Sequence, residues 1–179
     1  MAGQPLAEGN ARLDRLTLDL ERQVAAAGWD QPTHLFALVE TAELVRREPA
    51  LAADLGLGAE DPGGLTPVDQ GDLPDHASLD ELLGGIAWPA EVLGAAVTVE
   101  RLMLPPDVER EMPAAEGEAL QWLGEHPDRQ EVRLIVAVLR DGSRAAALRM
   151  RAHDDETSVL TGRDLVPGLA GALAATFAD

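Results

Sequence analysis

The residues most able to do chemistry lie in the stretch RMRAHDDETS, 149–158, where His153 is followed directly by three carboxylates. An imidazole beside carboxylates can bind a metal ion or transfer a proton. Neighbouring residues of a strand point to opposite faces, so His153 and Asp154 can share an ion only if the chain turns after Ala152. The stretch therefore predicts either a site at a turn or the polar end of a strand.

A second polar stretch, EHPD at 125–128, comes just before a predicted hairpin at 131–151. In the hairpin register given below, His153 lies opposite Arg129, which brings both polar stretches to one end of the hairpin. Imidazole and carboxylate together form a suitable ligand set for Zn, Mn or Fe. The predicted metal site comprises His126, Asp128, His153 and Asp154.

A purely structural interpretation of both stretches stays open. Turns at the end of a sheet normally carry polar residues, and the acids have neighbouring arginines to balance, at 129, 133, 149 and 151. None of the spacings H-x-x-x-H, H-E-x-x-H or D-x-D-x-D-G supports a metal site. Elsewhere, Asp30, His34 and Glu40 offer acids and an imidazole around another strand, and ordinary loop polarity explains them better.

The composition restricts the possible function classes. The 179 residues carry a formal net charge of −18 at pH 7, which disfavours binding to nucleic acid or anionic lipid. The chain has no cysteine, so thiolate metal sites and cysteine nucleophiles are excluded. Neither a G-x-S-x-G elbow, a phosphate-binding loop nor a G-x-G-x-x-G turn occurs, and we predict no cofactor.

Two further features bear on location and origin. The N-terminal residues lack the apolar run behind a basic flank that is typical of a secretory signal, so we expect a cytoplasmic protein. The chain contains no lysine, which indicates a GC-rich genome because lysine codons are rich in A and T. The acidity indicates solubility, a salt-adapted proteome, or a partner protein with a basic surface.

The pattern of apolar residues predicts a single α+β domain over 1–179, with a mainly antiparallel sheet and helices packed on one face. A Gly-, Pro- and Asp-rich loop is predicted at about 56–77, and a β-bulge or a doubly covered strand near 100–101. The predicted order begins with a helix at 10–27, a strand at 34–40, helical pieces at 41–56 and a helix from 78. A strand at 94–105, a helix at 114–126, the hairpin and a helix from 164 follow. In the helix at 114–126, Ala119, Leu120 and Leu123 are expected to face inward.

The hairpin register follows from the apolar residues of its two strands. We predict a three-residue loop at 140–142, with Gly142 in a left-handed conformation. In this register, the apolar residues at every second position of the two strands lie together on one face. That face is predicted to pack beneath the last helix, and the arginines lie on the other face with Ile135, Ala137 and Leu139. The apolar set is Val132, Leu134, Val136, Val138, Leu148 and Met150, and the helical stripe is Val166, Leu169, Leu173 and Phe177.

Four stretches carry a family resemblance: GWDQP (28–32), LFALVETAEL (35–44), HPDRQEVRLIVAVLRDG (126–142) and DLVPGLAGAL (164–173). They resemble a family of acidic proteins of about this length from high-GC actinobacteria. The resemblance spans nearly the whole chain. It implies no known activity, cofactor or catalytic residue, so no functional role is transferred from it.

Three functions are compatible with these observations. The first is a non-catalytic cytoplasmic binding or adaptor domain that contacts another protein through an open sheet face or an edge strand. The alternative is a metal-dependent enzyme, a hydrolase that uses the His and Asp cluster at the base of the hairpin. The third is a small-ligand pocket near Trp88 and Trp122, although these tryptophans are equally suited to the core.

Overall fold

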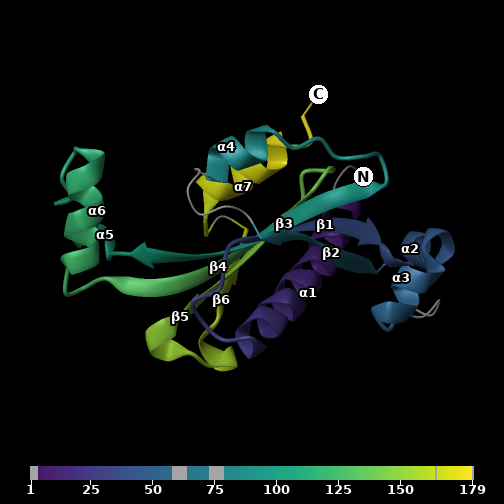
Figure 1. Ribbon diagram of the computed structural model, residues 1–179, viewed down its shortest axis with the longest axis horizontal. Coiled ribbons are helices and arrows are strands. Elements are labelled where there is room, and N and C mark those ends of the chain that lie inside the picture. Colours follow the sequence, from purple (N-terminus) through teal and green to yellow (C-terminus); the bar gives the residue numbers. More distant parts are fainter. Residues whose placement is uncertain (1–3, 58–63, 73–78, 164, 179) are drawn as a thin grey trace.

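The structure is a computed structural model, which describes residues 4–57, 64–72, 79–163 and 165–178. Its centre is a six-stranded antiparallel sheet with the strand order β2-β1-β3-β4-β5-β6 (Figure 1). The strands are β1 (His34–Glu40), β2 (Leu65–Asp72), β3 (Val92–Met103), β4 (Gln130–Leu139), β5 (Arg144–Met150) and β6 (Leu160–Gly162).

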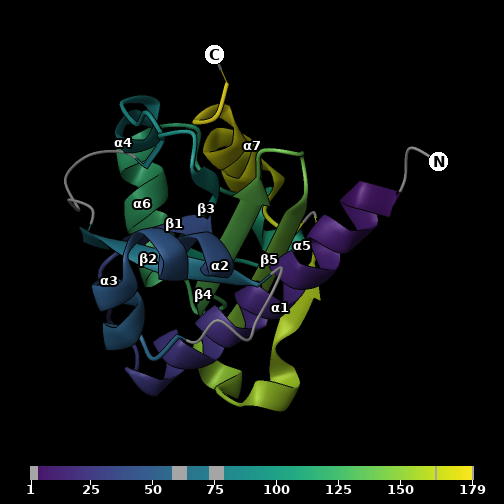
Figure 2. The same ribbon diagram turned by 90° about the vertical axis from the view of Figure 1, so that its right-hand side faces the viewer.

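Helices cover both faces of this sheet (Figures 1 and 2). The longest helix, α1, lies across one face, and α7 lies on the other face beside α4. The helices are α1 (Gln4–Ala26), α2 (Thr41–Arg47), α3 (Pro49–Asp54), α4 (Leu79–Gly84), α5 (Pro106–Glu109), α6 (Glu116–Glu125) and α7 (Pro167–Ala175), with 3-10 turns η1 (Arg151–His153) and η2 (Glu156–Ser158).

Each face of the sheet has its own apolar core. Leu13, Leu16 and Leu20 of α1 pack on the face that carries Ile135 and Ala137. On the opposite face, Leu169 and Leu173 of α7 pack on Val136, Val138 and Val97. The central strands are therefore apolar on both sides, as expected for strands covered on both faces.

The predicted α+β class and antiparallel sheet are confirmed. The helices, expected on one face, occupy both, because the hairpin face that carries Ile135, Ala137 and Leu139 is covered by α1. The domain therefore has three layers in the order helix, sheet, helix. No helix among the described residues combines the length and the apolar character needed to cross a membrane.

The hairpin register is confirmed pair by pair. Val132 lies opposite Met150 and Val138 opposite Arg144, and the pairing is unbroken between them. Arg144, which was expected on the other face with the remaining arginines, therefore shares the face of Val138. Leu139 and Ser143 close a three-residue loop, in which Gly142 has a φ of +93°. The predicted apolar face packs on α7 and on Leu165 and Val166.

Four predicted details differ from the structure. Residues 65–72, expected in a loop, form the edge strand β2, while 58–63 and 73–78 of that loop lie outside the described residues. The pairing of β3 with β4 is continuous from Gly94 to Met103, so the predicted bulge is absent. Strand β3 is buried from Gly94 to Thr98 but partly exposed from Val99 to Met103, so it is not covered on both faces near 100–101. On α6, Leu120 points outward with 66% of its surface exposed. The last helix begins at Pro167, with Val166 at the N-cap position, and Asp164 lies outside the described residues.

Candidate functional site

The first two predicted metal ligands lie at the end of α6. The His126 ring packs edge-on against Trp122, with ring centroids 4.8 Å apart. Its Nδ1 accepts a hydrogen bond of 3.0 Å from the backbone N–H of Asp128. These contacts close the turn between α6 and β4, and the Asp128 side chain is exposed.

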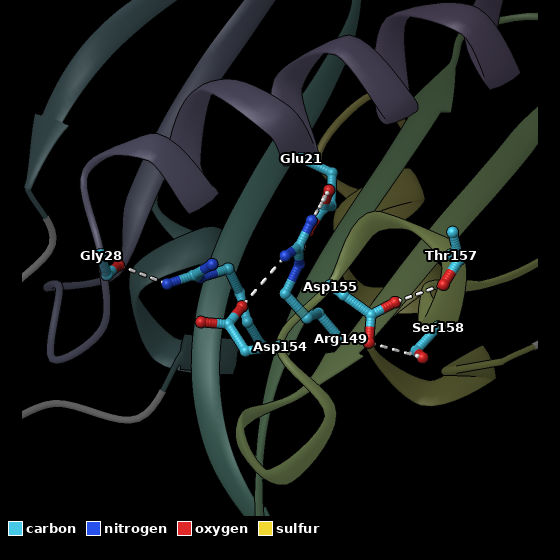
Figure 3. A network of polar contacts seen from close by, with 8 residues as sticks. Glu21, Gly28, Arg149, Asp154, Asp155, Thr157 and Ser158 are labelled. Carbon is cyan, nitrogen blue, oxygen red and sulfur yellow. Dashed lines mark hydrogen bonds and ion pairs between the residues drawn. The ribbon is translucent and has the colours of Figure 1, made fainter.

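The other two predicted ligands lie beyond β5. Strand β5 ends at Met150, and the chain turns into η1 instead of continuing to place His153 opposite Arg129. The His153 side chain is exposed, while the Asp154 carboxylate accepts a hydrogen bond of 3.0 Å from Nη1 of Arg149 (Figure 3). The strand pairing therefore does not bring His153 to the end of the hairpin that carries His126.

The part of the chain that the structure describes contains no cluster that resembles a metal site. Within the described ranges, no three His, Asp or Glu side chains are grouped so that they could hold an ion. Asp155, the next acid along, accepts hydrogen bonds from the hydroxyls of Thr157 and Ser158 (Figure 3). These hydrogen bonds hold the pKa of Asp155 below its ordinary value. Asp155 thus organises a turn.

The remaining candidates are separated. Asp30 binds Arg151, whereas Nδ1 of His34 lies 3.6 Å from the carboxylate of Asp69 on the neighbouring strand β2. Trp88 donates a hydrogen bond to Thr176 and stacks on the C-terminal Phe177. Trp122 lies on α6, far from α7 in Figure 1, so the two tryptophans do not line a common pocket.

The most extensive polar network lies between α1 and the sheet. Arg149 of β5 and Glu21 of α1 form an ion pair through two hydrogen bonds, although only 4% and 3% of their surfaces are exposed (Figure 3). The hydrogen bonds that Arg149 donates to Glu21 raise the pKa of Arg149, and the hydrogen bond to Asp154 adds to the effect. In turn, Arg149 and then Trp29 hold the pKa of Asp154 below its ordinary value.

A second arginine, Arg133 of β4, is opposite Arg149 in the strand pairing and is 1% exposed. It donates one hydrogen bond to the carbonyl of Gly28, while Nε and Nη1 have no partner among the described residues. Burial lowers the pKa of Arg133, and the nearby carboxylates of Glu100 and Glu21 partly offset that effect. Its guanidinium carbon also lies 4.3 Å from the ring centre of Trp29, a cation–π contact.

The loop after α1 is built around this arginine. Asp30 has a φ of +65°, and its backbone N–H and that of Gln31 both donate to the carboxylate of Glu100, at 2.8 Å and 2.6 Å. Arg151 lies over the same Trp29 ring at 5.6 Å and donates two hydrogen bonds to the Asp30 carboxylate. The loop is thereby fixed to β3, β4 and the turn η1 by charged side chains.

These interactions indicate a structural role for the network. The arginines stay protonated at neutral pH, and the pKa values of Asp30 and Asp154 are both lowered by bound guanidinium groups. None of these groups is therefore poised to transfer a proton near pH 7. The sequence offered one signal that was missed: Thr17 and Glu21 follow Leu13 at steps of four on the buried side of α1.

A second feature stands apart from the sheet. The last pair between β4 and β5 is Val132 with Met150, so beyond this point β3 and β4 pair only with each other within the described residues. Helices α5 and α6 lie at the tip of this two-stranded extension, at the far left of Figure 1. We call residues 102–131 the arm.

The arm exposes apolar side chains in an acidic setting. Leu120 on α6 is 66% exposed and Met103 at the end of β3 is 39% exposed. The arm has eight Asp or Glu residues and only two Arg residues. Isolated exposed leucines are common, but two apolar side chains on a projecting acidic element define a candidate contact surface.

The fold and the network define a three-layer α+β domain with a projecting acidic arm. The chain belongs to the PPA1309-like protein family, whose model matches residues 13–178. This match covers the network, the sheet, the arm and α7. A comparison with curated proteins gives no match, and a comparison with solved structures gives none.

Proposed function

We propose that the protein is a non-catalytic cytoplasmic binding domain, from a high-GC actinobacterium, that contacts another protein through its arm. The observation that carries the proposal is the position of Leu120, exposed on a helix that lies outside the three packed layers (Figure 1). The network under α1 is consistent with a binding role, because its charged groups pair with one another and hold α1 and the loop after it on the sheet.

The limited support of the arm by the rest of the sheet favours a role in binding a partner protein. A two-stranded ribbon is marginally stable alone, and here it extends past the last residues that β5 supports. Burial of an exposed leucine contributes about 1.5–3 kcal/mol. A partner that covers Leu120 and Met103 would therefore stabilise both the complex and the arm.

The charge of the arm specifies the kind of partner. Eight acidic residues against two arginines give a strongly negative element, which attracts a basic surface and raises the association rate at low salt. The exposed leucine requires an apolar anchor in the same partner. We therefore expect a protein segment that presents arginine or lysine around one or two large apolar residues.

A matched pair of variants tests the proposal by pull-down from cells that express the protein. Leu120→Gln removes the apolar contact from the arm, and Leu160→Gln makes the same change on β6, where Leu160 is 52% exposed. We expect the wild type and Leu160→Gln to retain a protein with a basic apolar segment, and Leu120→Gln to lose it. Retention by all three proteins, or loss from both variants, would overturn the proposal.

A further inference from the structure

A cleft lies on the α1 side of the sheet, away from the arm. It is formed by the last turns of α1, the start of β1 and one residue of the edge strand β2, and its volume is about 240 Å³. Liquid water occupies about 30 Å³ per molecule, so the cleft has room for a small organic molecule. Its lining comprises Leu20, Gln23, Val24, Ala27, Gln31, His34, Phe36 and Asp69.

The floor of the cleft is apolar and partly aromatic. Leu20, which is packed in the core between α1 and the sheet, and the partly buried Val24 carry the apolar stripe of α1 to the cleft. His34 and Phe36 project from the same side of β1, and their rings are stacked with centroids 6.2 Å apart and an interplanar angle of 26°. Such a surface accepts an alkyl or aryl group and can face a cation.

The rim of the cleft offers hydrogen-bond acceptors. The Asp69 carboxylate accepts one hydrogen bond of 2.7 Å from the backbone of Gly71 and has its other oxygen toward His34. Gln31 donates its amide N–H to the carbonyl of Ala27 at 3.1 Å, which leaves its side-chain oxygen to accept. A ligand that donates hydrogen bonds could therefore bind to both the Asp69 carboxylate and the Gln31 side-chain oxygen.

The electric field in the cleft favours a positive charge. Ala27 follows the C-terminal end of α1, where the helix dipole carries a partial negative charge. Asp69 adds a full negative charge, and the described lining contains no arginine. The net charge of −18 raises the local concentration of small cations further.

We propose that this cleft binds a small organic cation, an amine or guanidinium compound with an apolar chain or ring. The cationic head lies between the Asp69 carboxylate and the Gln31 side-chain oxygen, and the apolar part lies over Phe36 and Val24. The cation is either a free metabolite or an exposed side chain of a protein. The site is independent of the arm.

Calorimetric titration at about pH 8 tests the ligand class with three molecules of similar size. We expect phenethylamine to bind with a Kd of about 1 mM or tighter, and 2-phenylethanol and phenylacetate to bind at least about tenfold more weakly. A capped arginine that binds as tightly as phenethylamine would assign the cleft to a protein side chain, and weaker binding would assign it to a free amine. Equal binding of amine and alcohol, or no binding of the amine at about 10 mM, would overturn the proposal.

Three variants locate the binding. Asp69→Asn removes the charge and should weaken phenethylamine binding at least about tenfold. Asp54→Asn makes the same charge change on the exposed end of α3 and should leave binding unchanged. Ala27→Leu narrows the cleft at an exposed position, so it should abolish binding even if Asp69→Asn disturbs the turn at Gly71. Wild-type affinity in both Asp69→Asn and Ala27→Leu would show that the cation binds elsewhere.

Discussion

Glu21 and Arg149 form an ion pair that joins α1 to β5 in a place where both side chains are almost fully buried. Two charges taken out of water are stable there only because each is hydrogen-bonded to the other. Asp154 accepts a further hydrogen bond from Arg149. The pair therefore specifies where the N-terminal helix lies on the sheet.

Removal of one partner should be strongly destabilising. Glu21→Gln leaves Arg149 buried with only Asp154 as a charged partner, and we expect a loss of about 3–5 kcal/mol in the free energy of unfolding. Urea denaturation measures this loss. Glu118→Gln, at an exposed position of α6, is the control and should change the free energy by less than about 0.5 kcal/mol. Equal effects of the two variants would contradict the role of the pair.

The Asp154 contact predicts an acid dependence of stability. Arg149 lowers the carboxyl pKa of Asp154 from its ordinary 3.8, so the folded state binds fewer protons than the unfolded state. The contribution of Asp154 is then complete above that value and is lost as the pH falls through the lowered pKa. We expect the melting temperatures of wild type and Asp154→Asn to differ at neutral pH and to converge in acid. A difference that stays constant with pH would contradict the assignment.

A close approach of two strands at Gly94 gives a third prediction. A Cβ atom at this position would lie 2.2 Å from the carbonyl oxygen of Val138 and 2.6 Å from the Leu139 side chain. Gly94→Ala should therefore lower stability by about 1–3 kcal/mol through overpacking between β3 and β4. Gly124→Ala, on α6, meets no atom within 4 Å and should raise stability by up to about 1 kcal/mol. Thermal denaturation of both variants measures these changes. A Gly94→Ala protein as stable as the wild type would show that the contact between β3 and β4 is flexible.

Some of this structure was predictable because the governing interactions are local or periodic. The hairpin register followed from apolar residues of matching parity on both strands, and the left-handed Gly142 followed from the loop length. Strand β2 was missed because Pro67, Asp69 and Gly71 are typical of loops, yet proline is tolerated on an edge strand such as this one.

The network and the arm depend on contacts that sequence periodicity does not contain. Glu21 and Arg149 are 128 positions apart, and only the path of α1 across the sheet brings them together. Leu120 was expected in the core because apolar residues at helical spacing normally face inward, but α6 lies beyond the sheet that would cover it. The acids after His153 were grouped by proximity in sequence, although Asp154 turns toward Arg149.

The most direct test of the arm as a binding surface is photo-crosslinking in the living cell. A photoreactive amino acid placed at Leu120 should form a crosslink to one protein that carries a basic apolar segment, and the yield should fall as salt is raised in a lysate. The same amino acid at Leu160, exposed on β6, should give no crosslink to that protein. A crosslink from position 160 and none from position 120 would contradict the proposed function.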